Sequence, residues 1–361
     1  MSDNRTDARV LMVGPDRSLK GGIVSVVEGY FEAGLEDRCS ALCYQGTGAG
    51  SSLLEKNISF ARALLSYCRK IANYDVVHLH ISAKGSFKRK SIMANIAKHA
   101  GKKVILHEHS GEFARDFEAG DDGYRQNIRR VFNSVDRVVV LSEEWHDYFA
   151  ENVVSDPGNL TVLHNGVPIP PVNASPCKHH NVLFMGRLDD RKSPDILLRA
   201  SKSLLLSNPD IRIIFGGDGE LDRYRELACE LGIADRCDFI GWVVGVEKDR
   251  LFRNAGIYCL PSKNEAMPMS VMEAMSYGVP VITTNVGGVP QLIQNGLDGL
   301  LMEVDDVEGL SRLLTELSSS PKMRSEIGFA GRKKIIDCFS VQSSIDNLVN
   351  IYQDLFEGRI H

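Results

Sequence analysis

Short runs of β-branched and apolar residues alternate along the whole chain with stretches long enough for amphipathic helices. The expected strands of the first half are Arg9–Val13, Val76–Ile81, Lys103–His107, Arg137–Leu141 and Leu160–Leu163. Those of the second half are Asn181–Met185, Ile211–Phe215, Cys237–Ile240, Gly256–Leu260 and Val279–Thr283. Expected helices between them include Ile196–Leu206, Leu221–Leu231 and Val271–Tyr277. Strands that alternate with helices predict an α/β fold with parallel sheets covered on both faces.

The chain has 361 residues, which is too long for one ordinary core, so two domains are expected. Residues 164–171 contain three prolines, and polar residues follow to His180. Because proline extends neither a helix nor a central strand, this stretch predicts a linker. We expect a first domain over residues 1–170, a second over 171–340, and a C-terminal helix in 341–361 that packs back on the first domain.

Composition narrows the class of protein. Apolar residues make up 43% of the chain and charged residues 25%, as in globular enzymes. The formal net charge of -5 does not favour nucleic acid as a partner. The eight cysteines form no Cys-x-x-Cys pair and are typical of a reducing compartment. With no apolar signal core or bilayer-length apolar run, we expect a cytoplasmic protein that can lie peripherally at the inner face of the cell membrane.

Residues 261–274 run from a strand end through a loop into a helix that begins near Pro268. The free N–H groups near Met269 and Ser270 suit a phosphate. On either side of that phosphate, the carboxylates of Glu265 and Glu273 can accept hydrogen bonds from hydroxyls. On spacing alone, two ordinary surface glutamates at a helix start remain an alternative.

Two further turns lie at the carboxyl ends of strands of the second domain. In the first, Gly186 is followed by Arg187 and Lys192, two cations that can neutralise a diphosphate without metal. In the second, Gly217 precedes Asp218, and its lack of a side chain permits close backbone approach. A tight loop with no ligand is the alternative reading of the second turn.

Taken in order, these motifs resemble the retaining glycosyltransferases of family 4, whose paired-glutamate motif matches Glu265 and Glu273. The turns 284–291 and 295–301 also resemble that family, and the resemblance spans nearly the whole chain. One departure is Gln291, which stands where the family usually has glutamate. The resemblance implies the GT-B fold, two Rossmann-like domains that face a cleft, with a C-terminal helix crossing back to the first domain.

The resemblance also implies roles for individual residues. The catalytic set is Arg187, Lys192, Glu265 and His109. The donor-binding set is Gly21, Gly22, Gly186, Gly217, Asp218, Met267, Pro268, Met269, Ser270 and Glu273. The two cations would stabilise the leaving diphosphate, Glu273 would hold the ribose, and Glu265 would contact the transferred sugar. The donor would be a UDP- or GDP-sugar, with no cofactor and no metal, consistent with the lack of any Asp-x-Asp triplet.

In the first domain, Gly21 and Gly22 follow the first strand, where they permit approach to the donor phosphates or the acceptor or simply form a flexible turn. His107 and His109 alternate on one strand face, but two ligands are too few for a closed metal site. The family's cleft histidine matches His109, and His107 is read as structural. His78 and His80, at a similar strand end, are read as packed or cleft-lining.

The stretch 84–103 has seven basic residues and no acid. It is either a solvated helix face or a surface that meets anionic lipid or an acceptor phosphate, chiefly through Lys88, Arg89 and Lys90. Its Gly-Ser-Phe-x-Arg-Lys motif resembles enzymes that build bacterial surface polysaccharides on a lipid diphosphate carrier. We therefore expect a retaining, metal-independent glycosyltransferase with a glycan or lipid-linked acceptor. A nucleotide-sugar epimerase of the same fold and a non-catalytic binding subunit are the alternatives.

Overall fold

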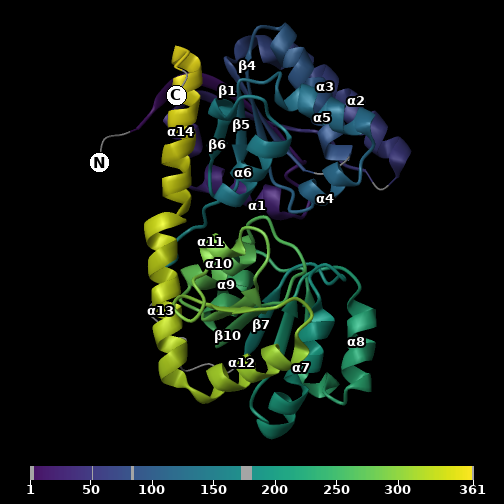
Figure 1. Ribbon diagram of the computed structural model, residues 1–361, viewed down its shortest axis with the longest axis vertical. Helices are drawn as coiled ribbons and strands as arrows, with labels where there is room; N and C mark the ends of the chain where they lie inside the picture. The colour runs from purple at the N-terminus through teal and green to yellow at the C-terminus, as the bar shows by residue number, and fades with distance from the viewer. Residues whose placement is uncertain (1–3, 51, 83–84, 172–180, 360–361) are drawn as a thin grey trace. The chain divides into compact units, whose positions relative to one another are not determined.

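A computed structural model describes residues 4–50, 52–82, 85–171 and 181–359. The chain divides into two compact α/β units (Figure 1). Unit 1 comprises the residues up to Gly166 together with those from Val341 onward, and unit 2 comprises Val167–Ser340. The division therefore falls inside the proline-rich stretch 164–171. The expected linker residues 172–180 lie outside the described residues.

Unit 1 is built on a six-stranded sheet with the order β2-β1-β3-β4-β5-β6, in which every neighbouring pair is parallel. The strands are β1 (Thr6–Gly14), β2 (Cys39–Gly46), β3 (Val76–Ile81), β4 (Lys103–Glu108), β5 (Arg137–Val140) and β6 (Leu160–Val162). The helices are α1 (Gly22–Glu32), α2 (Leu53–Lys70), α3 (Gly85–His99), α4 (Phe113–Glu118), α5 (Asp122–Phe132), α6 (Glu143–Asn152) and α14 (Val341–Glu357).

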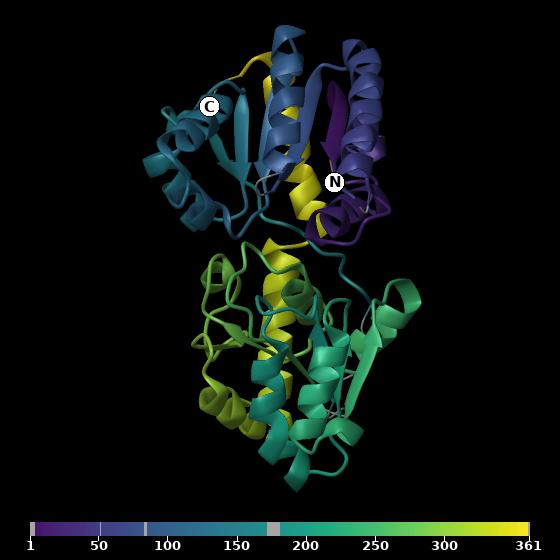
Figure 2. The same ribbon diagram turned by 90° about the vertical axis from the view of Figure 1, so that its right-hand side faces the viewer.

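Helices cover both faces of this sheet. On one face, Leu79 and Leu106 belong to a buried core that includes Tyr67 of α2, Met93 of α3 and Phe149 of α6. On the other face lies α14, which packs along β1 and also contacts β3 and α1. Figure 2 shows α14 in yellow behind the strands of this unit and α2 and α3 in front of them. Burial on both faces explains why the central strands are apolar almost throughout.

Unit 2 is built on a second six-stranded parallel sheet with the order β12-β11-β10-β7-β8-β9. Its strands are β7 (Val182–Met185), β8 (Ile213–Gly216), β9 (Cys237–Gly241), β10 (Ile257–Leu260), β11 (Val281–Thr284) and β12 (Leu300–Met302). Its helices are α7 (Pro194–Ser207), α8 (Leu221–Glu230), α9 (Gly245–Arg253), α10 (Met269–Ser276), α11 (Val289–Leu292), α12 (Val307–Ser319) and α13 (Pro321–Cys338). Within this unit α12 packs on α7, and α10 packs on α13.

Each sheet has a point where the strand order reverses. In unit 1 the chain runs from β1 outward to β2 and then returns to β3 on the other side of β1. In unit 2 the reversal lies between β7 and β10. Open α/β sheets bind ligands outside the carboxyl ends of the strands at such points, so the fold itself marks one candidate site in each unit.

The predicted α/β class with two parallel sheets is confirmed. Every expected strand is present with small shifts of its ends, while β2 and β12 were not expected. The cysteines within the described residues are free thiols. Among the described helices, none combines the length and the apolar character needed to cross a bilayer.

Candidate active site

An ion pair joins the two loops at the strand reversal of unit 2. Lys192 follows β7 and Glu265 follows β10, and the Lys192 ammonium donates a hydrogen bond to Oε1 of Glu265. A second cation, Arg191, has its guanidinium 4.0 Å from Oε2 of the same carboxylate. Glu265 is only 6% exposed. Because water is largely excluded there, charges at this position interact more strongly than on an open surface.

A strained turn holds Lys192 in place. Its backbone N–H donates to Oδ1 of Asp189 at 3.0 Å, and the next residue, Ser193, has a φ of 51°. A left-handed conformation costs a residue with a side chain roughly 1–2 kcal/mol. The Ser193 hydroxyl partly offsets that cost by donating to the carbonyl of Asp190 at 3.1 Å. The turn therefore fixes the direction in which the Lys192 side chain leaves the backbone.

The Gly287-Gly288 turn supports the loop that carries Glu265. A Cβ atom at Gly287 would overlap the carbonyl oxygen of Glu265, and one at Gly288 would overlap that of Ala266. The Gly288 N–H donates to the Ala266 carbonyl at 3.1 Å. These glycines are thus needed for a close approach between two backbone segments, which holds the Glu265 carboxylate near Lys192.

The other two glycine turns also meet each other. The N–H of Leu188 donates to the carbonyl of Asp218 at 2.7 Å, and a Cβ at Gly217 would overlap the carbonyl of Gly186. The loops after β7 and β8 therefore pack backbone against backbone, which explains the glycines at these positions. Arg187 lies on the first of these loops with its side chain 67% exposed and its Nε 3.8 Å from Oδ2 of Asp189.

The second motif glutamate has a partner that the sequence analysis missed. Nζ of Lys248, on α9, lies 2.6 Å from Oε1 of Glu273, on α10. The Lys248 side chain is 28% exposed and that of Glu273 is 17% exposed. Lys248 stands in no motif, so only the packing of α9 beside α10 could have identified it.

The amino end of α10 lies on the same loop as Glu265. Pro268 is the residue just before the helix, and its carbonyl accepts from the N–H groups of Val271 and Met272 at 3.1 and 3.2 Å. The N–H groups of Met269 and Ser270 precede these first intrahelical hydrogen bonds and are available to an anion. Met267 is buried. This end of the helix thus has the features expected of a phosphate site.

In unit 1 the predicted histidines form a network on the sheet face that α14 covers, in which His78, His80 and His107 are buried and His109 is half-buried. Nδ1 of His80 lies 2.9 Å from Nε2 of His109, and Nε2 of His78 lies 3.2 Å from Nδ1 of His107. Nδ1 of His78 is 2.7 Å from the hydroxyl of Tyr352 on α14. Burial lowers the pKa of His78 and of His109 to about 3, so these imidazoles are neutral at ordinary pH.

Three of these histidines, His78, His80 and His107, present nitrogen atoms within 4.8 Å of one another, a spacing that could hold a metal ion. Both nitrogens of His78 are already hydrogen-bonded, however. The buried ring nitrogens without a partner among the described residues are Nε2 of His80 and Nε2 of His107. Two nitrogens are fewer than a zinc site requires, so the network is better explained by packing and hydrogen bonding.

The other predicted residues of unit 1 separate into different environments. Gly21, with a φ of 147°, precedes α1, which begins at Gly22. Lys88 is exposed and Arg89 is half-buried, but Lys90 is buried. Lys90 therefore does not belong to an exposed basic surface, which corrects the expectation that the three side chains act together at a membrane. Lys84 lies outside the described residues.

Comparison with known proteins identifies the class of enzyme. The family described as Glycosyl transferases group 1 matches residues 169–334, and that described as Glycosyltransferase Family 4 matches residues 42–169. The two matches together span residues 42–334, and the chain is a glycosyltransferase. The predicted enzyme class, a glycosyltransferase of the hexosyltransferase type, is thereby confirmed.

Among the relatives of this glycosyltransferase is the UDP-Gal:alpha-D-GlcNAc-diphosphoundecaprenol alpha-1,3-galactosyltransferase of Escherichia coli, 26% identical over 79% of this chain and 77% of the relative. The D-inositol 3-phosphate glycosyltransferase of Streptomyces avermitilis is 26% identical over 62% of this chain, which spans 53% of that relative.

Two solved structures show the fold. HepE of Anabaena in complex with UDP has a TM-score of 0.75 at 16% identity, over 95% of this chain and 99% of the other. Sucrose-phosphate synthase of Thermosynechococcus elongatus has a TM-score of 0.78 at 19% identity, over 97% and 100%. The predicted GT-B fold is confirmed for this glycosyltransferase.

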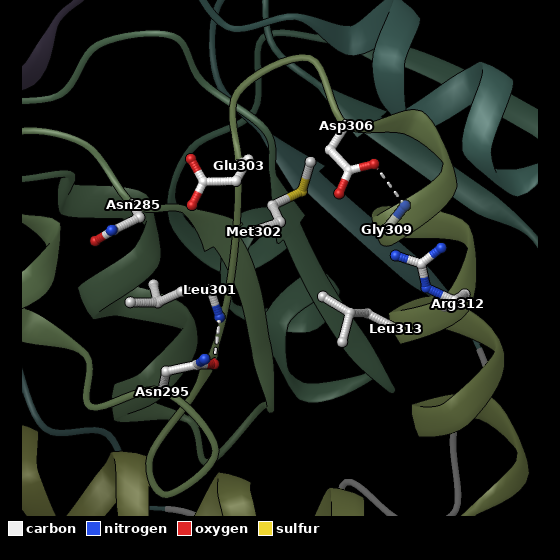
Figure 3. Close-up of a pocket in the computed structure, with 9 residues that line it drawn as sticks. All are labelled: Asn285, Asn295, Leu301, Met302, Glu303, Asp306, Gly309, Arg312 and Leu313. Atoms are coloured by element: carbon white, nitrogen blue, oxygen red, sulfur yellow. Dashed lines mark hydrogen bonds between the residues drawn. The ribbon is translucent and has the colours of Figure 1, made fainter.

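A separate pocket lies beside β12 and α12 of the glycosyltransferase, with a volume of about 390 Å³ (Figure 3). Two of its polar groups make local hydrogen bonds, from the Gly309 N–H to Asp306 at 2.7 Å and from the Leu301 N–H to Asn295 at 2.9 Å. Its lining residues are Asn285, Asn295, Leu301, Met302, Glu303, Asp306, Gly309, Arg312 and Leu313. None of them is a predicted site residue, so this pocket is distinct from the Lys192–Glu265 pair.

Proposed function

We propose that this glycosyltransferase moves a sugar from a nucleotide diphosphate sugar to an acceptor hydroxyl with retention of anomeric configuration and without a metal ion. We propose further that the acceptor is a lipid-linked glycan intermediate in surface polysaccharide biosynthesis. The observation that carries the proposal is the ion pair of Lys192 and Glu265 on the loops that meet at the strand reversal of unit 2, beside the amino end of α10.

The electrostatics of this arrangement favour a diphosphate leaving group. When the bond between sugar and phosphate breaks, negative charge grows on the nucleotide diphosphate. Lys192, Arg187 and the free N–H groups at the start of α10 would stabilise that charge, and fixed cations and dipoles need no reorganisation during the step. Because these groups supply positive charge directly, the proposal requires no metal ion.

The carboxylates would then bind the neutral parts of the donor. Glu265 would accept hydrogen bonds from the transferred sugar, and Glu273, on α10, would hold the ribose hydroxyls. In this mechanism the acceptor hydroxyl attacks from the face that the diphosphate leaves. The departing phosphate oxygen takes the proton of that hydroxyl, the new glycosidic bond forms, and the old bond to phosphate breaks.

The proposed acceptor is supported by a relative, the Escherichia coli galactosyltransferase, whose name gives a sugar on diphosphoundecaprenol as its acceptor. A peripheral location at the membrane would use the exposed Lys88 and the half-buried Arg89. Flotation with liposomes that contain anionic lipid tests this part. Reversing the charge of Lys88 and Arg89 is expected to abolish binding, whereas unchanged binding would contradict it.

The central test is a thermal-shift screen of the purified protein against UDP- and GDP-sugars, followed by a transfer assay with the stabilising donor and a lipid diphosphate sugar acceptor. We expect transfer that persists in EDTA and an α-linked product from an α-linked donor. Interconversion of the donor without acceptor would identify an epimerase instead. Donor binding without any turnover would indicate a non-catalytic subunit.

A further inference from the structure

A lysine of unit 1 is buried at the carboxyl ends of the sheet. Lys90 projects from α3 and is 1% exposed. Its Nζ donates to the hydroxyl of Thr47 at 3.1 Å and to that of Ser86 at 3.2 Å. Thr47 follows β2, and both its N–H and its hydroxyl donate to the carbonyl of Gly14, the last residue of β1, at 3.0 Å. The ammonium of Lys90 therefore lies next to the point where the strand order of unit 1 reverses.

No acidic side chain in the described part of the chain balances this charge. Among the described residues, no carboxylate lies within ion-pair distance of Nζ of Lys90, and the charged group that acts on it is another cation, Arg89. Burial, together with Arg89, lowers the pKa of Lys90 to about 7. The side chain also runs back to Ser86, in the first turn of α3, where the helix dipole disfavours a cation.

The neighbouring arginine adds a second unused donor. Nε of Arg89 is buried and has no hydrogen-bond partner among the described residues. Two adjacent cations with buried nitrogen atoms and no carboxylate are unfavourable unless an anion binds. The hydroxyl of half-buried Ser86 is one of the two oxygens bonded to the Lys90 ammonium, so rotation of that small side chain would let an incoming oxygen take its place.

We propose that Lys90, with Arg89 and Ser86, binds a phosphate group of the acceptor. Assigning the phosphate to the acceptor rests on the proposed function, in which Lys192, Arg187 and α10 of unit 2 bind the phosphates of the donor. It follows that the acceptor is a phosphate- or diphosphate-bearing molecule, and that a neutral sugar alone binds weakly.

The test uses inorganic pyrophosphate as the probe and the full chain saturated with the nucleotide that stabilises it best, so that the donor site is filled. Hydrogen exchange of the segment 85–99 and the melting temperature are followed as pyrophosphate is added. We expect slower exchange in this segment and a higher melting temperature. Lys90→Met should weaken pyrophosphate binding at least tenfold, and Arg89→Gln should weaken it to a smaller extent.

Lys56→Met, at an exposed position of α2 in the same unit, is the matched control and should bind pyrophosphate like the unmodified chain. Methionine has about the volume of the buried lysine stem, so Lys90→Met is expected to fold, and retained nucleotide binding verifies this. Equal pyrophosphate binding by Lys90→Met and the unmodified chain would overturn the proposal. Loss of nucleotide binding in folded Lys90→Met would also overturn it, because the phosphate would then belong to the donor.

The same experiment separates the two proposals. If no nucleotide sugar binds the unmodified chain, the proposed function fails. In that case, pyrophosphate protection of residues 85–99 that depends on Lys90 would still establish the anion site. If instead a nucleotide sugar binds but pyrophosphate gives no such protection, the anion site fails and the proposed function stands.

Discussion

The ammonium of Lys192 and the carboxylate of Glu265 are bonded across the two loops that follow β7 and β10. The two opposite charges compensate each other in a largely buried position, since Glu265 is almost fully buried and the Lys192 side chain is 12% exposed. A donor diphosphate would compete with Glu265 for the same ammonium. Binding of the donor would then free the carboxylate to accept hydrogen bonds from the sugar.

Lys192→Met tests the role of the cation. We expect turnover to fall roughly 10²–10³-fold, equivalent to about 2.7–4 kcal/mol, by analogy with loss of one oxyanion-hole donor. Lys263→Met, which removes an exposed lysine paired with Asp305 at 3.1 Å, should have little effect. Lys192→Met also leaves the buried Glu265 carboxylate without its ammonium partner, which lowers the free energy of unfolding. Adding Glu265→Gln should restore the melting temperature but not the turnover, and restored turnover would contradict the catalytic role.

Lys248→Met tests how the Glu273 carboxylate is held. Without the ammonium at 2.6 Å, that carboxylate is free to rotate, so donor binding should weaken several-fold, an effect of about 1 kcal/mol for a partly exposed pair. The turnover number of Lys248→Met at saturating donor should stay near its original value. Glu273→Ala, which removes the carboxylate itself, should weaken donor binding more than Lys248→Met does. Glu247→Gln, a change at an exposed position of the same helix, is the control. Calorimetric titration of the donor gives the dissociation constants, and unchanged affinity in Lys248→Met would argue against a positioning role.

Gly287→Ala tests the close backbone approach behind Glu265. The added methyl group overlaps the Glu265 carbonyl, so the loop must move, and we expect the free energy of unfolding to fall by about 1–3 kcal/mol together with a loss of transfer activity. Gly296→Ala is an informative control. Gly296 also has a positive φ, of 81°, but has open space around it, so this change introduces backbone strain without overlap. Activity should survive in Gly296→Ala, and equal activity in both variants would refute the supporting role of Gly287.

The histidine network predicts a loss of stability in acid. The pKa of His78 and of His109 is about 3 in the fold, against an ordinary value of 6.5, so the unfolded chain takes up protons first as the pH falls below about 6.5. Each such group lowers the free energy of unfolding by up to about 1.4 kcal/mol per pH unit between those values. Buried Glu108 has the opposite effect on the free energy of unfolding. Its pKa is raised from 4.5 to about 8, so between these values the folded chain holds a proton that the unfolded chain has lost, and stability rises as the pH falls.

Burial also lowers the pKa of His80 and His107, so four histidines oppose Glu108 and stability should fall from pH 6.5 toward pH 5. Urea unfolding at pH 5, 6 and 7 measures the slope. His78→Gln should show a shallower slope than the unmodified chain, whereas His99→Gln, at an exposed position, should keep the original slope. Identical slopes in all three proteins would contradict this account.

The strands that the sequence analysis missed, β2 and β12, are both edge strands. β2 has a half-buried, mixed sequence without the continuous apolar run of a central strand, and β12 has only three residues, Leu300–Met302. Central strands are buried on both faces and so are recognisable from composition alone. β2 and β12 are defined mainly by their hydrogen bonds to a neighbouring strand, which a local pattern does not reveal.

In the candidate site, too, the sequence reveals local motifs but not contacts between distant segments. Glu265, Glu273 and Lys192 lie in recognisable motifs, whereas the pairing of Lys192 with Glu265 and of Lys248 with Glu273 joins separate segments of the chain. A lysine in a basic run predicts exposure, yet Lys90 is buried because α3 turns that side chain toward Thr47. Burial depends on packing between distant segments, so these features require the structure.

The polypeptide begins unit 1, completes unit 2 and only then supplies α14, which covers β1 and contributes Tyr352 to the histidines. During synthesis the first sheet therefore emerges from the ribosome with part of one face, including its histidines, uncovered until α14 is made. Unit 2 is continuous in sequence and is free to fold earlier. A ribosome that stalls before Val341 would thus release a chain whose unit 2 is native and whose unit 1 is prone to aggregate.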